Sequence, residues 1–201
     1  GAELILIHDD NNIGECIDEC LQTAMRMAEE DPNVFVPQQF INPANPQVHR
    51  SHTGQEILEQ VDGPIHGFCS GIGTGGTITG IGETLKAANP DMEIWAVEPE
   101  HAAILSGGSI GSHLQMGIGD GVIPDILNQN IYQDIYIVKD EEAIRTAQEL
   151  ASKEGIMCGI SSGTNVAAAI QLAKKLGEGK TVVTVLPDTA ERYFSTPLFE
   201  E

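Results

Sequence analysis

The sequence predicts an α/β fold in which helices pack against a mainly parallel sheet. Short apolar runs of strand length alternate with amphipathic helical patterns along the chain. A glycine-rich turn, Gly71–Thr77, joins one of these strands directly to a helix. Strands that alternate with helices pair in parallel, because each helix crosses back over the sheet. With 201 residues, the chain is long enough to bury the core of one domain, or of two small ones.

The first part of the chain contains one clear helical pattern. Leu4–Ile7 is an apolar run of strand length, and the side chains of Asn11 and Asn12 are suited to cap a following helix. Apolar residues then recur at steps of three and four over 13–28, which predicts an amphipathic helix. Asp31-Pro32-Asn33 is a typical helix stop.

A change of composition near residue 40 predicts a domain boundary. Val34–Val36 has the residues of a strand that runs on towards Phe40. The two prolines of Asn42–Pro46 lack N–H donors and bias the residues before them away from helix, so we expect this stretch to be irregular. We therefore expect residues 1–40 to be part of a small N-terminal domain and residues 41–201 to form a large domain.

The rest of the chain continues the alternation of strands and helices. Strands are predicted at 65–70, 94–98, 135–138, 156–158 and 181–186. Helices are predicted at about 53–61, at 76–88, from a capping Asp140 to 151, and over the segment that bears Val166, Ala167, Ile170 and Ala173. Residues 101–131 are rich in glycine without a period, which indicates a long functional loop region.

Composition excludes several classes of function. Thirty Asp and Glu residues against ten Lys and Arg give a net charge of −20, which repels phosphate backbones and anionic lipids. No stretch approaches about 18 consecutive apolar residues. No basic segment followed by an apolar run marks a secretory signal. We therefore expect neither nucleic-acid binding nor a membrane role.

The four cysteines are interpreted as small buried apolar residues in a reducing cytoplasm. Cys16 and Cys20 lie in the first helical pattern, and Cys69 and Cys158 lie in strand-like runs. None forms a Cys-x-x-Cys pair, and no histidine lies at zinc-binding spacing. The sequence therefore predicts neither disulfides nor a metal site.

The glycine-rich turn predicts a phosphate site. Glycines let the backbone approach an anion closely, and the N-terminus of the following helix directs free N–H groups at it. Thr74 and Thr77 add hydroxyl donors. Gly71, Gly73 and Gly76 also match G-x-G-x-x-G, and Glu98 follows about 20 residues later at a strand end, as in dinucleotide-binding folds. The local pattern therefore leaves a nicotinamide-dependent dehydrogenase open.

Six motifs in order give a more specific indication. They are Pro37–Phe40 with Asn42–Pro46, His49 and Thr53-Gly54; Gly73–Thr77; Ala96–Pro99; Gly117–Gly119 with Ile123-Pro124; Gly159–Gly163; and Leu186–Asp188 with Glu191–Tyr193. Together they resemble the cysteine synthases (O-acetylserine sulfhydrylases). These are pyridoxal-phosphate (PLP) enzymes of fold type II, similar to the β subunit of tryptophan synthase.

The resemblance implies a fold, a cofactor and a set of binding residues. The fold is the layered parallel-sheet domain of PLP fold type II, with a truncated remnant of the small domain. The cofactor phosphate is bound by Gly73, Thr74, Gly75, Gly76 and Thr77. The Ser161 hydroxyl meets the pyridine nitrogen, while Gln39, Gly117 and Gly119 lie on the substrate side of the pocket. In this family, cysteine and acetate are formed from O-acetylserine and sulfide.

The resemblance also indicates what this sequence lacks. The family uses a Schiff-base lysine and a Thr-Ser-Gly-Asn-Thr-type loop, and this chain contains neither motif. We therefore expect the chain to correspond to the C-terminal two-thirds of such an enzyme and to be inactive alone, with no catalytic residue of its own. We also expect the apolar residues within 4–7 and 13–28 to be exposed and to promote self-association.

Several alternatives and partners follow. Ala190, Met116 and Asp120–Val122 depart from the family pattern around the pocket, which leaves a cystathionine β-synthase-like enzyme open. Glu191–Tyr193 favours the sulfhydrylase. The resemblance implies a cytoplasmic homodimer, and a protein that only binds partners, such as the C-terminal tail of serine acetyltransferase, is a non-enzymatic alternative.

Overall fold

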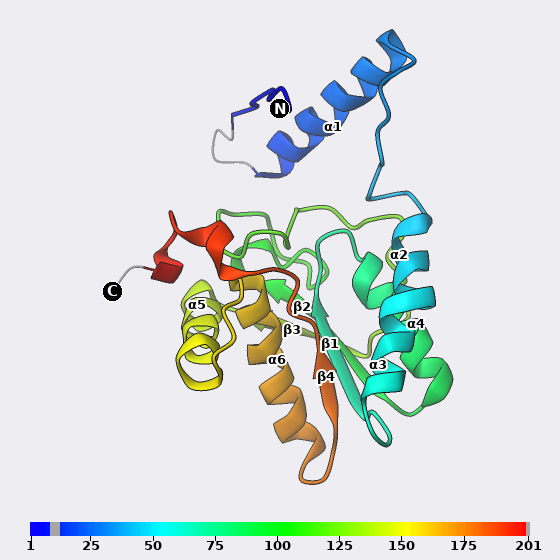
Figure 1. Ribbon diagram of the computed structural model, residues 1–201, viewed down its shortest axis with the longest axis vertical. Helices are drawn as coiled ribbons and strands as arrows, with labels where there is room; N and C mark the ends of the chain where they lie inside the picture. Colours follow the sequence, from blue (N-terminus) through cyan, green and yellow to red (C-terminus); the bar gives the residue numbers. More distant parts are fainter. Residues whose placement is uncertain (9–12, 200–201) are drawn as a thin grey trace.

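A parallel sheet organises the chain beyond residue 66, as the computed structural model shows (Figure 1). The structure describes residues 1–8 and 13–199. The strands have the order β3-β2-β1-β4, and all three pairings are parallel. They are β1 (Gly67–Gly71), β2 (Glu93–Pro99), β3 (Asp134–Val138) and β4 (Val182–Thr184). The predicted parallel α/β fold is confirmed, with the ends of these four strands shifted by at most two residues.

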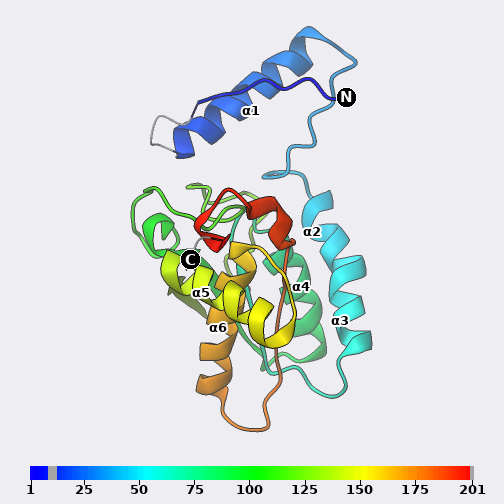
Figure 2. The ribbon, with the colours of Figure 1, turned by 60° about the vertical axis from the view of Figure 1, so that its left-hand side comes forward.

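Helices cover both faces of the sheet (Figures 1 and 2). One face carries α4 (Gly76–Ala88), with α2 (Ala44–Val48), the π-helical turn η1 (His49–Thr53) and α3 (Gly54–Gln60) outside it. The other face carries α5 (Asp140–Glu149), η3 (Leu150–Glu154) and α6 (Ile160–Leu176). Short 3₁₀ turns are η2 (Glu100–Ala102), η4 (Ala190–Tyr193) and η5 (Pro197–Phe199). The predicted helix 76–88 is confirmed with the same bounds.

The alternation of side chains along β1 divides the core into two layers. Phe68 is buried with Ile78 and Ile81 of α4, whereas its neighbour Cys69 is buried with Ala168 and other residues of α6. Successive side chains of a strand point to opposite faces, so a central strand buried on both sides is apolar throughout. This arrangement of helix, sheet and helix layers fixes the carboxyl end of β1 between the N-termini of α4 and α6.

Helix α1 (Ile13–Glu30) lies apart from these layers, and residues 31–43 connect it to α2 (Figures 1 and 2). The predicted helix and its stop are confirmed, since α1 ends at Glu30 and the Asn33 N–H donates to Asp31 Oδ1 (2.9 Å). The proposed caps Asn11 and Asn12 lie outside the described residues. Among the helices described, none is both long and apolar enough to cross a membrane.

Three predicted strands are wrong. Leu4–Ile7 and Val34–Val36 pair with no strand in the described part of the chain, and Leu4 and Phe35 are 80% and 82% exposed. Residues 156–158 form only an isolated bridge, between Cys158 and Thr189. An apolar run becomes a strand only where a neighbouring strand accepts its backbone hydrogen bonds, and no local pattern shows that.

The expected irregular stretch at Asn42–Pro46 is also wrong, because helix α2 begins at Ala44. Pro46 is the third residue of α2. Its missing N–H costs nothing there, because the first N–H groups of a helix have no acceptor within it. The Asn42 side chain accepts the Ala44 N–H (3.0 Å) and stabilises this start.

Two interpretations of single side chains need correction. Asp140 is the first residue of α5 and does not cap it. Its carboxylate instead accepts the Leu114 N–H (2.8 Å) and the Gln115 Nε2 amide (2.8 Å). Cys69 and Cys158 are buried as expected, but Cys20 is exposed and Cys16 is only half-buried, because α1 packs against little of the core.

Candidate functional site

The predicted anion loop lies at the carboxyl end of β1, where ligands bind in open parallel sheets. β1 ends at Gly71, and α4 begins five residues later at Gly76. Gly75 is the residue before α4 and has a φ of +76°, a left-handed conformation that favours glycine. The N–H groups of Thr74, Gly75 and Thr77 have no acceptor among the described residues. They are therefore available to an anion.

Neighbouring segments approach this loop too closely for side chains. A Cβ atom on Gly73 would lie 2.6 Å from the Gly117 carbonyl oxygen. One on Gly76 would lie 1.9 Å from Asn45 Oδ1. The loop is therefore a cradle of backbone donors at a helix N-terminus, with the hydroxyls of Thr74 and Thr77 beside it. Its chemistry fits a phosphate group.

A second glycine segment lies against the first. Gly117 and Gly119 have φ values of +88° and +72°. The Gly119 N–H donates to the Ile72 carbonyl (2.8 Å), and His113 Nε2 lies 3.2 Å from the Gly119 carbonyl oxygen. The structure therefore brings together the predicted residues of the two loops, which are at least 40 positions apart in the sequence.

The N-terminus of α6 forms a third side of the site. Ser161 is its second residue and is buried. Asn165, one turn further on, accepts the Gly71 N–H at Oδ1 (2.7 Å) and donates from Nδ2 to the Val185 carbonyl (2.8 Å). It thereby fixes the end of β1 to α6. Sequence reasoning missed Asn165, and the only signal was a polar residue in the first turns of a helix whose later part is largely apolar.

Two buried polar atoms under α6 have no hydrogen-bond partner in the described part of the chain. They are Ser162 Oγ and Asp188 Oδ1. Asp188 Oδ2 accepts from the Tyr193 hydroxyl (2.5 Å), and a Cβ on Gly159 would lie 2.1 Å from Asp188 Oδ1. Buried polar groups are normally satisfied. Ser162 belongs to the first turn of α6, and Asp188 lies beside Gly159, the residue before that helix.

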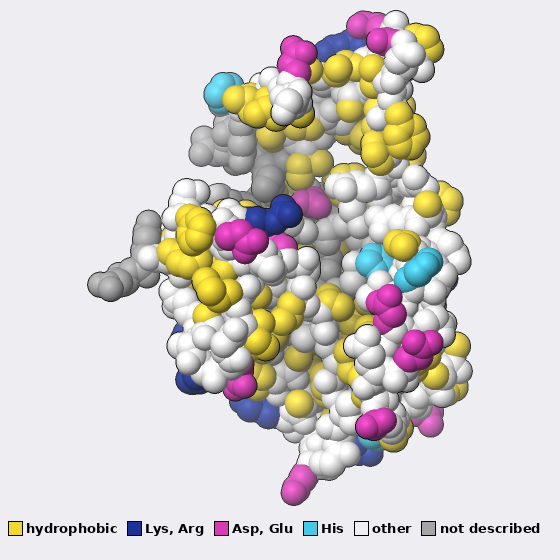
Figure 3. Space-filling model, viewed as in Figure 1, with side chains coloured by type: hydrophobic (Ala, Val, Ile, Leu, Met, Phe, Trp, Pro, Cys, Tyr) yellow, Lys and Arg dark blue, Asp and Glu magenta, His cyan; other side chains and the backbone are white. Residues whose placement is uncertain are grey.

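Gln39 lies in the turn that follows the extended linker and is exposed. Its carbonyl oxygen accepts from Asn45 Nδ2 (2.9 Å), and the same nitrogen donates to Thr74 Oγ1 (2.9 Å). A cavity of about 400 Å³ lies beside it, and the space-filling view shows a hollow between the α1 part and the body (Figure 3). Its lining residues are Ile17, Cys20, Leu21, Val36, Pro37, Gln38, Gln39, Phe40 and Asp120.

Asp120 supplies a carboxyl group to the lining of this cavity. Burial raises the pKa of its carboxyl, and the charge of His113 acts in the opposite direction. One carboxylate oxygen lies 3.4 Å from the position of a Cβ on Gly73. The sequence singled out Asp120 only as a departure from the family pattern, and the structure places it between the anion loop and the Gln39 turn.

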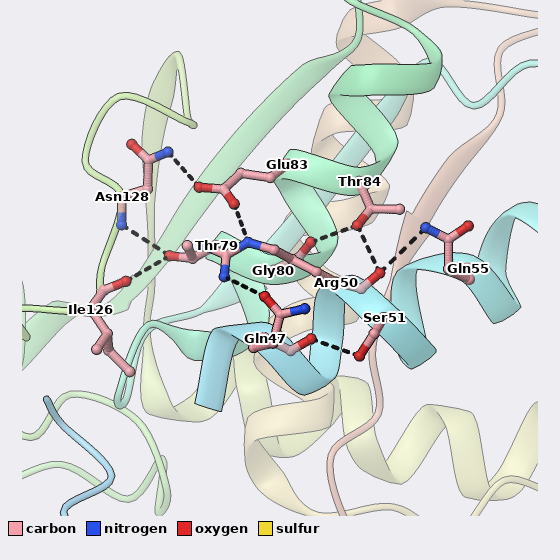
Figure 4. Close-up of polar contacts among 10 residues, drawn as sticks. All are labelled: Gln47, Arg50, Ser51, Gln55, Thr79, Gly80, Glu83, Thr84, Ile126 and Asn128. Carbon is pink, nitrogen blue, oxygen red and sulfur yellow. Dashed lines mark hydrogen bonds and ion pairs between the residues drawn. The ribbon is translucent and has the colours of Figure 1, made fainter. Parts of the chain in front are cut away.

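Polar contacts join α4 to the segment α2–η1 and to the loop at 126–128 (Figure 4). Arg50 donates to Glu83, and Asn128 Nδ2 donates to the other Glu83 oxygen (2.8 Å). Burial acts to raise the pKa of Glu83, but the bonds from Arg50 and Asn128 outweigh it and lower the pKa.

Nearer the loop, His49 Nε2 lies 3.3 Å from Thr77 Oγ1. Burial lowers the pKa of His49, which favours a neutral ring beside Thr77.

Glu98 is not available for the ribose role that the dinucleotide alternative requires. It is buried, and its carboxylate accepts the N–H groups of Leu105 (2.7 Å) and Ser106 (3.1 Å) and the Ser106 hydroxyl (2.9 Å). It therefore fixes the start of the long loop region.

Among the described residues, no group of three His, Cys, Asp or Glu side chains could hold a metal ion.

Comparison with known proteins adds independent information. The family model of pyridoxal-phosphate dependent enzymes matches residues 1–188. A cysteine synthase of Staphylococcus aureus (strain Mu50 / ATCC 700699) is 48% identical over 200 residues, which is 99% of this chain and 63% of that protein. The chain therefore spans less than two-thirds of the length of this relative.

Two solved structures show the same fold. The crystal structure of a cysteine synthase from Entamoeba histolytica matches with a TM-score of 0.88 and 39% identity, over 100% of this chain and 58% of that one. The crystal structure of an O-acetylserine dependent cystathionine β-synthase from Helicobacter pylori matches with a TM-score of 0.87 and 35% identity, over 91% of this chain and 60% of that one. The predicted PLP fold type II is confirmed.

Proposed function

Because this chain belongs to the family of pyridoxal-phosphate dependent enzymes, we propose that the whole protein is a cysteine synthase. In the proposed reaction the bond between the β-carbon and the acetate oxygen of O-acetylserine breaks, and a bond from the β-carbon to sulfur forms. The products are cysteine and acetate. The similarity to the Staphylococcus aureus cysteine synthase supports this choice.

The observation that carries the proposal is the cradle at the N-terminus of α4. Gly73, Thr74, Gly75, Gly76 and Thr77 are proposed to bind the cofactor phosphate through backbone N–H groups and two hydroxyls. The positive end of the α4 dipole favours this anion, and the approach of Gly117 and Asn45 excludes larger side chains from the loop. The chain carries a net charge of −20, which repels anions in general. The N–H and hydroxyl donors gathered at this loop offset that repulsion locally.

The remaining residues are proposed to orient the cofactor and the substrate. When bound, the cofactor supplies an electron sink that allows the β-substituent to leave. Ser161 would offer the ring nitrogen a neutral hydroxyl instead of a carboxylate, which would leave that nitrogen largely unprotonated. Gln39, Gly117 and Gly119 line the substrate side.

The amine that the family uses is not supplied by this sequence. Lys86 is half-buried and donates to the Pro90 carbonyl, while Lys139, Lys153 and Lys175 are exposed and paired with acidic residues. Lys174 and Lys180 are also exposed. We therefore assign the activity to the whole protein and expect the 201-residue chain alone to bind the cofactor without turnover.

Cofactor binding by this chain tests the proposal. Titration of the chain with pyridoxal phosphate, followed by equilibrium dialysis, is expected to give saturable binding that inorganic phosphate competes away. The variants Thr74→Val and Thr77→Val each remove one hydroxyl, and each is expected to weaken binding by about tenfold. Thr146→Val in α5 is the matched control, since the Thr146 hydroxyl bonds only within its own helix. Saturable binding of NAD at the same loop would contradict the proposal.

A cystathionine β-synthase-like activity is the second candidate, favoured by the similarity to the Helicobacter pylori enzyme. Turnover of O-acetylserine with sulfide, compared with turnover of serine with homocysteine, separates the two in the whole protein.

A cytoplasmic homodimer is also proposed. The C-terminal tail of serine acetyltransferase is a proposed partner, which a titration of that peptide tests.

A further inference from the structure

We propose that Asn45 is a positioning residue of the phosphate site. Its side-chain amide fixes the Thr74 hydroxyl as a hydrogen-bond donor towards the phosphate, and it ties the Gln39 turn to the same loop. This inference rests on the proposed function, because it takes Gly73–Thr77 as the loop that binds the phosphate of pyridoxal phosphate.

The two bonds of Asn45 determine which way its amide points. Nδ2 lies 2.9 Å from the Gln39 carbonyl oxygen and 2.9 Å from Thr74 Oγ1. A backbone carbonyl only accepts hydrogen bonds, so the group facing it must be the NH₂. An NH₂ group has two hydrogens, and here one is available for each partner. Asn45 is therefore a donor to Thr74.

The donor role of Asn45 leaves the Thr74 hydroxyl with one remaining capacity. A hydroxyl has one proton to donate and two lone pairs that accept. Thr74 Oγ1 accepts from Asn45 Nδ2 (2.9 Å) and from the Gly76 N–H (3.4 Å). Its own proton has no acceptor among the residues that the structure describes. It is therefore free to be donated to a phosphate oxygen, and a charged acceptor makes that bond stronger.

Packing holds Asn45 in this position. Asn45 belongs to α2, and its Oδ1 lies directly over the first residue of α4, where a Cβ on Gly76 would be only 1.9 Å away. In the next turn of α4, a Cβ on Gly80 would lie 2.3 Å from the Pro46 carbonyl oxygen. The absence of side chains at both glycines lets α2 rest on α4 and bring Asn45 to Thr74.

Two substitutions test the role of Asn45. Asn45→Asp keeps the size of the side chain but removes both donated bonds, takes up the Thr74 proton and adds a negative charge beside the phosphate. Asn45→Ala removes the bonds without adding charge. Asn130→Asp, in an exposed loop, is the control for the added charge.

The measurement compares pyridoxal phosphate with pyridoxal, which lacks the phosphate, in binding titrations on the folded chain. Asn45→Ala is expected to weaken binding of pyridoxal phosphate by about tenfold and Asn45→Asp by about a hundredfold. Binding of pyridoxal is expected to change less than about twofold, and Asn130→Asp is expected to change neither. A merely structural role would weaken both ligands alike, so the ratio of the two affinities identifies positioning of the phosphate.

The outcomes separate this inference from the proposed function. If both Asn45 variants bind pyridoxal phosphate as tightly as the unaltered chain, or lose both ligands equally, the inference is overturned and the proposed function stands. If the unaltered chain binds pyridoxal phosphate no better than pyridoxal, the loop is not a phosphate site and both fall. Should Asn45→Asp fail to fold, Asn45→Ala decides between these outcomes.

Discussion

Helices α4 and α1 both carry apolar residues at helical spacing, but they are held in different ways. In α4, Ile78 and Ile81 are fully buried between β1 and neighbouring segments. In α1, Leu21 and Met27 remain 39% and 37% exposed, and cavities of about 400 and 190 Å³ lie beside the helix. Figure 3 shows hydrophobic side chains at the surface of this upper part of the molecule.

The difference shows that an amphipathic pattern defines a face but does not provide a surface to cover it. Helix α4 follows a central strand and packs directly on the sheet, whereas α1 is joined to α2 through residues 31–43, which form neither helix nor strand. The expectation that apolar residues within 4–7 and 13–28 are exposed is therefore confirmed for Leu4, Leu6, Leu21 and Met27. Self-association through them stays a prediction.

Truncation of one apolar side chain in each helix gives the largest expected contrast. Ile81→Ala should lower the free energy of unfolding by about 3 kcal/mol, because it opens a cavity in a fully buried site. Leu21→Ala should lower it by less than about 1 kcal/mol, because Leu21 already contacts solvent. Urea denaturation followed by the fluorescence of the buried Trp95 measures both. Equal losses would show that α1 is packed as firmly as α4.

Alanine substitutions on two faces of α4 test how closely α2 packs against this helix. Gly80→Ala should cost about 2 kcal/mol, because its Cβ would meet the backbone oxygen of Pro46 at 2.3 Å. Gly82→Ala is the matched control, since its Cβ would meet only side-chain atoms of Ile131 and Ile94, at 2.9 and 3.1 Å. These atoms can move, and the helix propensity of alanine offsets part of the cost, so the net change should stay within about 1 kcal/mol. A larger cost at Gly82 would mean that α2 does not rest on α4 as described.

The smallest expected effect concerns the Arg50–Glu83 ion pair. Both side chains are about one-third exposed, so a double-mutant cycle with Arg50→Met and Glu83→Gln should give a coupling of about 0.5 to 1 kcal/mol. The pKa of Glu83 is lowered in the folded protein. Its contribution to stability is therefore complete above its ordinary value of about 4.3 and is lost as the pH falls below it.

Chemical denaturation of the unaltered chain and of Glu83→Gln at pH 7 and pH 3 measures that pH dependence. The unaltered chain should lose more stability between the two than the variant. A coupling of zero at pH 7 would indicate that α2 and η1 are held to α4 by packing and by other hydrogen bonds, such as those from the Thr84 hydroxyl to the Arg50 carbonyl (3.2 Å) and between His49 and Thr77.

Much of the site could be predicted because its chemistry is local. The Gly71–Thr77 turn between an apolar strand and a helix indicates a phosphate cradle from residue types alone, and α4 has the predicted bounds. The local pattern could not distinguish between the two phosphate ligands, pyridoxal phosphate and a dinucleotide. The spacing of Glu98 matches a dinucleotide fold, and only the structure shows that Leu105 and Ser106 engage its carboxylate.

The residues that hold the site together could not be predicted. Asn165 bonds Gly71, which is 94 positions away, and Asn45 bonds Thr74, which is 29 positions away. An asparagine in a helix carries no sign of the distant group that it will meet. The wrong strands at Leu4–Ile7 and Val34–Val36 fail for the same reason, since a strand exists only with a partner.

The alternation of strands and helices, the anion loop and the resemblance to PLP enzymes could all be predicted, because they depend on residue type and short spacing. Three features became visible only in the folded chain: Gly117 and Asn45 contact the loop, the Glu98 carboxylate is hydrogen-bonded to Leu105 and Ser106, and α4 is buried while α1 is not. These facts depend on which distant segments share a surface. Packing of the sheet and its two helix layers sets that arrangement, and no local pattern contains it.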